Sequence, residues 1–101
     1  MRKGWIQDVY QAGRVFHGRR MVLFVAPGTG LVAVVAGRRI GNAVQRNRAR
    51  RVLRAAWREI APRVDPARDV VMVARPPILG AKTQDLVADV SELIEEPSWA
   101  R

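Results

Sequence analysis

The chain has 101 residues, 49% of them hydrophobic, which is enough for one small domain over residues 1–101 with its own core. It has no cysteine and one histidine, which excludes disulfides, thiolate chemistry and cysteine-based zinc sites and disfavours a Ser-His-Asp triad. The net charge is +9, no apolar run approaches the ~20 residues that span a bilayer, and the first residues lack a signal-peptide-like apolar block. We therefore expect a cytoplasmic protein with no membrane-spanning segment and no metal site.

The first part of the chain predicts one helix and three strands. Residues 4–12 repeat apolar side chains at helical spacing and are followed by Gly13, a residue type that often ends helices. Residues 15–17 are a possible short strand, and 21–26 and 31–36 are β-prone runs. The Pro-Gly-Thr-Gly sequence between those two runs predicts a tight hairpin, and a basic loop follows the second run.

The second part predicts a long helix, a strand and a final helix. Asn42 is a plausible N-cap for a helix that ends near Pro62. A β run at 70–73 precedes two prolines, and residues 83–96 repeat apolar side chains at helical spacing. The order α-β-β-β-α-β-α predicts an α+β sandwich, with helices against one mixed four-stranded sheet. Generic chirality rules would give the strand-helix-strand crossover a right hand.

The long helix has two unlike faces. Apolar residues, among them Leu53, Trp57 and Ile60, recur at three- and four-residue steps on one face, so we expect these three in the core. The other side holds guanidinium groups, whose planar donor forks suit phosphate oxygens. We call this side the arginine face, which consists of Arg46, Asn47, Arg48, Arg50, Arg51, Arg54 and Arg58.

The charge pattern favours a polyanionic partner over a merely solvated face. Solvated helix faces usually mix signs, but no acidic residue lies between Arg46 and Arg58. Residues 1–60 hold thirteen Lys and Arg against two acidic residues, whereas 61–101 hold five against seven. We therefore predict a nucleic-acid surface that excludes the acidic last helix, with an anionic membrane surface as the main alternative.

Residues 37–54 resemble the signature of the bacterial ribonuclease P protein subunit. They contain the basic pair Arg38-Arg39, a Gly-Asn-Ala-Val turn from Gly41, and an Arg-Asn-Arg sequence from Arg46 with further arginines after it. The first helix, the central strand and the strand after the long helix also resemble the family in the same order. The resemblance therefore covers nearly the whole chain.

The resemblance implies an accessory subunit of an endoribonuclease. In that family a catalytic RNA, with Mg²⁺ as the cofactor of the RNA-protein holoenzyme, removes the 5′ leader of precursor tRNA, and the protein assists without catalysing. The implied partners are the catalytic RNA and precursor tRNA, with one protein monomer per RNA. The resemblance also implies an unusual left-handed β-α-β crossover. The positions that match RNA-subunit-binding residues of the family are Arg38, Arg39, Asn42, Arg46, Asn47, Arg48, Arg50, Arg51 and Arg54.

The resemblance further implies a leader-binding cleft between the first helix and the sheet. The expected leader-binding residues are Ile6, Tyr10, Phe16 and Phe24, because aromatic faces stack on bases with roughly 1–3 kcal/mol per base. A plain core role for Tyr10 and Phe24 remains an alternative. Ile6 stands where the family often has an aromatic residue, and the last helix is acidic where relatives are often basic. Both departures weaken the expectation for leader affinity more than for RNA-subunit binding.

Three other functions remain as alternatives. A ribosomal RNA-binding module shares the basic charge but gives no reason for this signature. An amphipathic membrane-surface protein explains the long helix but not three strands with a sheet core. A stand-alone nuclease needs a metal or acid-base site, and the sequence offers no cluster of residues for one.

Overall fold

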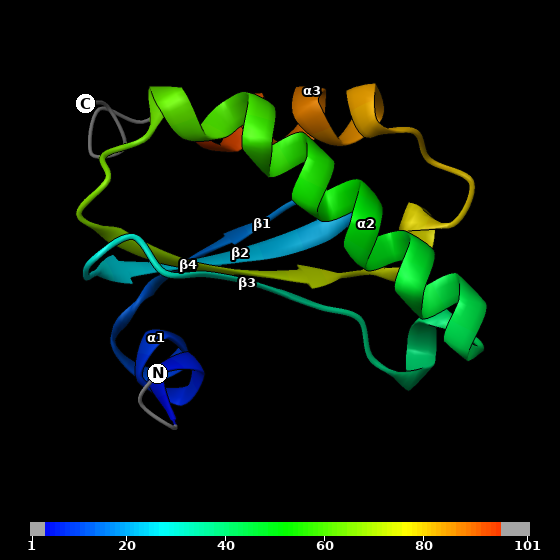
Figure 1. The fold of residues 1–101 in the computed structure, drawn as a ribbon, viewed down its shortest axis with the longest axis horizontal. Helices are drawn as coiled ribbons and strands as arrows, with labels where there is room; N and C mark the ends of the chain where they lie inside the picture. The colour runs from blue at the N-terminus through cyan, green and yellow to red at the C-terminus, as the bar shows by residue number, and fades with distance from the viewer. Residues whose placement is uncertain (1–3, 96–101) are drawn as a thin grey trace.

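The computed structural model describes residues 4–95, and its element order confirms the predicted α-β-β-β-α-β-α sequence. Short 3-10 turns at Arg38–Ile40, Ala61–Arg63 and Pro76–Ile78 join some of the elements. The described residues do not include Arg2, Lys3, Trp99 or the last residue of the helix predicted over 83–96. The elements are α1 (Trp5–Ala12), β1 (Arg14–His17), β2 (Met21–Pro27), β3 (Val32–Val35), α2 (Ala43–Ile60), β4 (Arg68–Ala74) and α3 (Thr83–Leu93) (Figure 1).

The four strands form one mixed sheet in the order β1-β2-β4-β3. The pairs β1/β2 and β2/β4 are antiparallel, while β3 pairs with β4 in parallel. The predicted hairpin between β2 and β3 is therefore wrong, because β4 is inserted between these two strands. Residues 28–31 do not make a tight turn between paired strands; they pass over one end of β4.

Asp69, the second residue of β4, holds that connection in place. Its Oδ1 accepts hydrogen bonds from the backbone N–H groups of Thr29 (3.0 Å) and Leu31 (2.9 Å). Gly28 approaches so closely that a Cβ atom there would lie 2.1 Å from the Asp69 Cγ. Glycine is thus required at this position by space, and the Asp69 carboxylate, only 8% exposed, satisfies backbone donors that the sheet leaves unpaired.

The connection from β3 through α2 to β4 has the left hand that the family resemblance implies. In Figure 1 both strands run from left to right, α2 returns above the sheet, and β3 lies in front of β4. Seen by the viewer, the chain therefore turns counterclockwise as it passes from β3 in front to β4 behind. This is a left-handed crossover. The generic right-handed rule does not hold for this chain.

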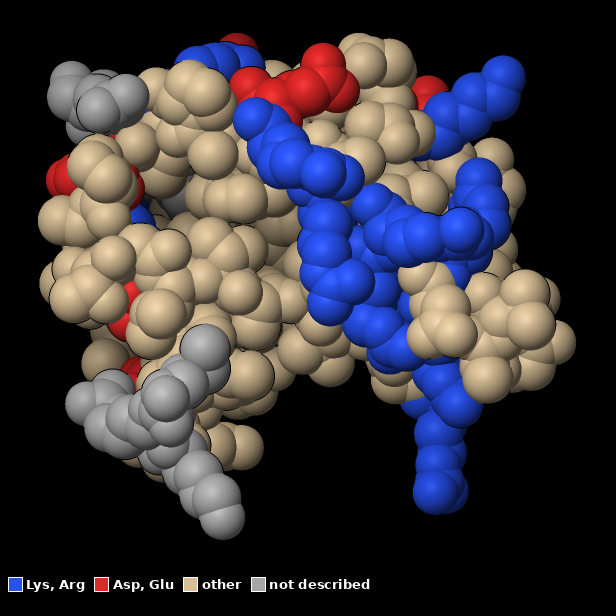
Figure 2. All heavy atoms as spheres, viewed as in Figure 1, with Lys and Arg blue, Asp and Glu red and all other residues tan. Residues whose placement is uncertain are grey.

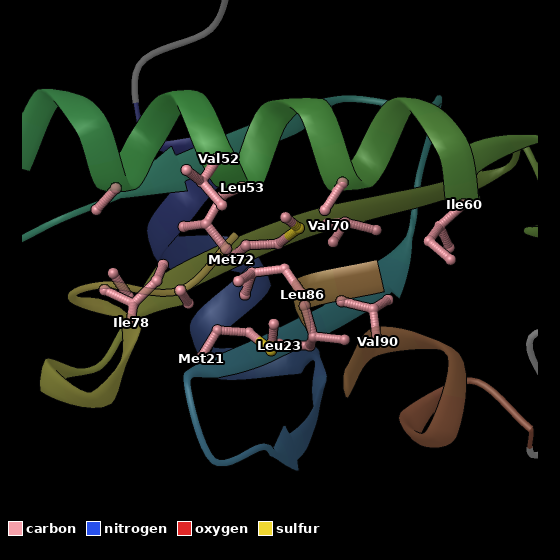
Figure 3. Packing of buried hydrophobic residues seen from close by; sticks show 14 of the residues in the cluster. Met21, Leu23, Val52, Leu53, Ile60, Val70, Met72, Ile78, Leu86 and Val90 are labelled. Carbon is pink, nitrogen blue, oxygen red and sulfur yellow. The ribbon is translucent and has the colours of Figure 1, made fainter. Parts of the chain in front are cut away.

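The sheet separates two apolar clusters. Met21, Leu23 and Met72 point towards α2 and α3, and pack there with Leu53 and Leu86 in the larger cluster (Figure 3). The intervening residues of the same strands point to the other face, because side chains alternate along a strand. There α1 covers the sheet through a smaller cluster whose buried members are Trp5, Val9, Ala26 and Val71.

Candidate nucleic-acid interface

The start of α2 is fixed by a capping box, as the asparagine predicted. The Asn42 Oδ1 accepts from the Gln45 N–H at 2.9 Å, and the Gln45 Oε1 accepts from the Asn42 N–H at 2.8 Å. Gly41 has φ +137°, a conformation that side chains rarely adopt, and a Cβ there would meet the Gln45 Oε1 at 1.9 Å. The Gly-Asn sequence therefore determines where the helix begins and how its arginines are oriented.

The apolar side of α2 anchors the helix to the sheet. Ala49, Val52, Leu53, Ala56 and Ile60 are buried, and all five belong to the larger cluster. Removing that much apolar area from water contributes roughly 1.5–3 kcal/mol for each large side chain. The arginine face is consequently a fixed surface of the folded protein.

Trp57 departs from its predicted core position. It packs against the larger cluster but is only half-buried, and it lines two hollows at the surface. Its place at the margin of the apolar stripe, next to Arg58, is the sequence feature that could have indicated this.

The guanidinium groups of the arginine face fall into two sets. Arg48 donates to the Ala81 carbonyl at 2.8 Å, Arg46 donates to the Gly41 carbonyl at 3.0 Å, and Arg50 donates to the Asn47 Oδ1. These residues use part of their donor capacity inside the protein. The side chains of the exposed members Arg51, Arg54 and Arg58, and those of Arg38 and Arg39, have no hydrogen bond or ion pair to any residue within 4–95.

These arginines form one basic patch over α2. Figure 2 shows Lys and Arg side chains gathered there, with acidic side chains along the margin nearest α3. A hollow of about 380 Å³ lies within the patch, lined by Arg48, Arg51, Arg54, Arg58 and Thr83 among others. Four guanidinium groups around one depression give a strongly positive surface with the shape and donors to hold phosphate groups.

The acidic side chains of α3 are partly engaged with the protein itself. Asp89 accepts two hydrogen bonds from the Arg20 guanidinium at 3.0 and 2.9 Å, and Asp85 accepts from the Lys82 N–H at 2.9 Å. Gln84 links the start of α3 to Glu59 at the end of α2, at 2.9 Å. The negative charge of α3 therefore lies beside the arginine face and limits the basic patch on that side.

On the opposite face of the sheet, three of the expected leader-binding residues lie together. Ile6, Tyr10 and Phe24 are half-buried and pack against the smaller cluster. The rings of Tyr10 and Phe24 meet edge to face, with centroids 4.6 Å apart and planes at 64°. Burial raises the pKa of the Tyr10 hydroxyl above its ordinary value, so the group stays a neutral donor at physiological pH. We call Ile6, Tyr10 and Phe24 the α1-face cluster.

Phe16 is not part of that cluster. It pairs with Leu23 across the β1/β2 register and therefore points to the face covered by α2 and α3, where it packs against the larger cluster. The Arg14 guanidinium carbon lies 5.2 Å from the centroid of its ring, within the range of a cation–π contact. The structure thus separates Phe16 from the other three expected leader-binding residues.

The helical spacing placed one further residue on the arginine face that the family resemblance did not include among the RNA-subunit-binding positions. Arg58 follows Arg54 by one helical turn, is exposed, and lines both the basic hollow and a second hollow beside β3. The single histidine, His17, is the exposed last residue of β1.

Two further properties of residues 4–95 bear on the candidate functions. Within this range no three His, Asp or Glu side chains are grouped closely enough to hold a metal ion. No helix in the same range combines the length and apolarity needed to cross a bilayer.

Comparison with known proteins gives consistent matches over nearly the whole chain. A family model described as Ribonuclease P matches residues 2–98. The ribonuclease P protein component of Chloroflexus aggregans is 37% identical over 99 residues, covering 94% of this chain and 73% of that protein. The corresponding protein of Symbiobacterium thermophilum is 41% identical over 93 residues, covering 88% and 81%.

Solved structures agree in fold. The RNase P protein of Staphylococcus aureus superposes with a TM-score of 0.77 at 19% identity, covering 94% of this chain and 90% of that one. The RNase P protein of Thermotoga maritima, in complex with 1-(4-fluorophenyl)-2-thiourea, also gives 0.77, at 15% identity, covering 93% and 94%. At these identities the two structures support the α+β fold of the chain.

Proposed function

This chain belongs to the ribonuclease P protein family, and from that premise we propose that it binds the catalytic RNA through the arginine face and the precursor-tRNA leader through the α1-face cluster. As the protein component of an endoribonuclease, it takes part in tRNA processing. The observation that carries the proposal is the set of exposed guanidinium groups that have no partner among residues 4–95, on a helix anchored by five buried residues. Such a surface is preorganised for the phosphates of a folded RNA.

The two proposed RNA surfaces lie on opposite faces of the sheet, since α2 covers one and α1 the other (Figure 1). One protein molecule can therefore contact the catalytic RNA and the substrate at once. In the α1-face cluster, the half-buried rings of Tyr10 and Phe24 offer an aromatic surface for bases, while Ile6 supplies apolar contact alone. We propose one protein per RNA, acting in the cytoplasm, where precursor tRNA is processed.

We assign the Mg²⁺-dependent hydrolysis to the RNA. The donor set of the protein does not fit a catalytic metal site, because residues 4–95 contain no grouped carboxylates and histidines. The Asp69 Oδ1 and both carboxylate oxygens of Asp89 accept hydrogen bonds within the protein. The protein would then contribute RNA affinity and substrate discrimination, with no protein residue in a chemical step.

The direct test is precursor-tRNA cleavage at low Mg²⁺, with the protein alone, with a bacterial ribonuclease P RNA alone, and with both. We expect no cleavage by the protein alone and strong stimulation of the RNA by the protein. Cleavage without RNA would indicate a nuclease, and a lack of stimulation with every such RNA tested would refute the assignment. Recovery of the RNA that co-purifies with the protein identifies its natural partner.

A further inference from the structure

Residues of α1, β3 and α2 line a groove at the outer edge of β3. In Figure 1, α1 lies on one face of the sheet and α2 on the other. Two hollows, of about 570 and 370 Å³, share Val32 and Trp57 in their walls and so form one continuous groove. Ile6 enters the wall from α1, and Arg54 and Arg58 enter from α2. We call these five residues the edge groove.

The edge groove combines an aromatic surface with two cations. Trp57 is half-buried, so part of its indole remains accessible, and Val32 is 41% exposed beside it. The guanidinium groups of Arg54 and Arg58 bond to no side chain or carbonyl within the described part of the chain. Proteins bind single-stranded nucleic acid with this combination, because bases stack on aromatic rings and phosphates pair with guanidinium groups.

The backbone of β3 adds donors and acceptors to the same groove. The Val70 N–H donates to the Leu31 carbonyl at 2.9 Å, so in a parallel ladder the odd-numbered residues of this segment bond to β4. The N–H and C=O groups of Val32 and Val34 consequently point away from β4, towards the open edge. Within residues 4–95 no strand pairs with that edge, which leaves these groups available for the polar edges of a base.

We propose that the edge groove binds single-stranded RNA, and that this RNA is the part of the precursor-tRNA leader that extends beyond the α1-face cluster. The proposal rests on the proposed leader site, because Ile6 belongs to both surfaces and makes them continuous. A base stacks on Trp57, and a neighbouring phosphate binds Arg58, which this proposal assigns to the leader and not to the catalytic RNA. Arg54 lies between the two RNA-binding surfaces, because it lines both the edge groove and the basic hollow. A second copy of this chain is disfavoured as the occupant, since it would bring these arginines against identical ones.

The test measures the affinity of the reconstituted RNA-protein holoenzyme for precursor tRNAs whose leaders are shortened one nucleotide at a time from the 5′ end. Trp57→Leu keeps apolar bulk but removes the aromatic face, and we expect it to weaken binding of the long-leader substrate about fivefold. Arg58→Ala should lower the salt dependence of the same affinity by about 0.7, the value for one phosphate contact of a single strand. Both effects should vanish once the leader is too short to reach the edge groove.

Arg63→Ala is the matched charge control, because the Arg63 guanidinium donates to the Ser91 hydroxyl of α3 at 3.0 Å and lies outside the edge groove. It should change binding equally for all leader lengths, or not at all. Thermal unfolding of Trp57→Leu and Arg58→Ala checks that both remain folded, and Arg58→Ala keeps the test decisive if Trp57→Leu is unstable.

The outcomes separate this proposal from the function on which it rests. If Tyr10→Ala shows a leader-dependent loss while Trp57→Leu and Arg58→Ala do not, the edge groove proposal is overturned and the leader site stands. Losses from Trp57→Leu and Arg58→Ala that are equal with and without a leader would mean contact with the catalytic RNA, and would also overturn it. If no variant, Tyr10→Ala included, depends on the leader, the proposed leader site itself fails.

Discussion

Tyr10 and Phe24 meet edge to face with ring centroids 4.6 Å apart, and both are only half-buried, so part of each residue remains exposed. Tyr10→Ala should therefore lower affinity for precursor tRNA roughly tenfold, because one stacked base contributes about 1–3 kcal/mol, and leave mature tRNA little affected. Competition binding of the two tRNAs to the reconstituted holoenzyme measures this difference. Equal losses for both would identify Tyr10 as a core residue.

Phe16→Ala supplies the matched control for Tyr10→Ala. It removes an aromatic ring of similar size from the other face of the sheet, so it should not change the preference for the leader.

Tyr10→Phe tests the hydroxyl apart from the ring. Burial raises the pKa of the Tyr10 hydroxyl above that of an ordinary tyrosine, so the hydroxyl stays protonated at neutral and mildly alkaline pH. The preference for leader-bearing tRNA should therefore not change over that pH range.

Alanine variants of the arginine face should show two kinds of effect, one on RNA binding alone and one on both binding and stability. The Arg51 side chain is exposed and has no partner in the part of the chain that the structure describes, so Arg51→Ala should reduce the salt dependence of RNA binding by about 0.7–0.9 and leave the unfolding midpoint unchanged. Arg48 bonds to the Ala81 carbonyl, so Arg48→Ala should also lower the free energy of unfolding by about 1 kcal/mol. Binding titrations over a salt series, with urea unfolding of each variant, measure both effects. Identical behaviour of the two variants would contradict the distinction.

Between elements, the connection from β2 to β3 depends on one carboxylate. Asp69→Ala removes the acceptor for the N–H groups of Thr29 and Leu31 and should lower the free energy of unfolding by about 2–4 kcal/mol. Asp69→Asn keeps the shape and one acceptor oxygen, so it should lower the free energy of unfolding by less than Asp69→Ala does. Asp65→Ala is the control, because Asp65 accepts from the Ala67 N–H at a more exposed site. Urea unfolding that gave Asp69→Ala the same small loss as Asp65→Ala would count against this account.

Most elements could be predicted from sequence because their signals are local. Helical spacing, Gly13, Asn42 and Pro62 lie within or beside the helices that they define, and the structure places helix boundaries within a few residues of the expected ones. The wrong hairpin shows the limit. The Pro-Gly-Thr-Gly sequence carries an ordinary turn signal, whereas the insertion of β4 depends on pairing with residues about 40 positions away.

The residues of the candidate site also differ in whether local sequence was enough to predict their place. The arginine face follows from the 3.6-residue period of one helix, so its members could be listed from the sequence. Phe16 could not be assigned to a face without the β1/β2 register, since a shift of one residue reverses every side chain of a strand. The edge groove was beyond sequence reasoning, because α1, β3 and α2 meet there only through the fold.

At the scale of the whole molecule, a net charge of +9 is concentrated over α2 (Figure 2). In the absence of RNA these like charges repel one another, and salt screens that repulsion, with a Debye length of about 10 Å at 0.1 M. Raising NaCl from about 50 to about 300 mM should therefore raise the thermal unfolding midpoint by a few degrees, a change of well under 1 kcal/mol. A differential scanning calorimetry series measures it. A fall in the midpoint would mean that attractive pairs such as Arg20–Asp89 dominate instead.

The strand order also has a consequence for the time course of synthesis. β4 is the pairing partner of both β2 and β3, yet it leaves the ribosome only after α2 has been translated. Until residues 68–74 emerge, β3 has no neighbour and α2 has only part of the surface on which it packs. β1 and β2 pair without β4, but β3 joins the sheet only through β4. A chain interrupted before residue 68 would therefore carry the arginine face without the complete sheet that orients it.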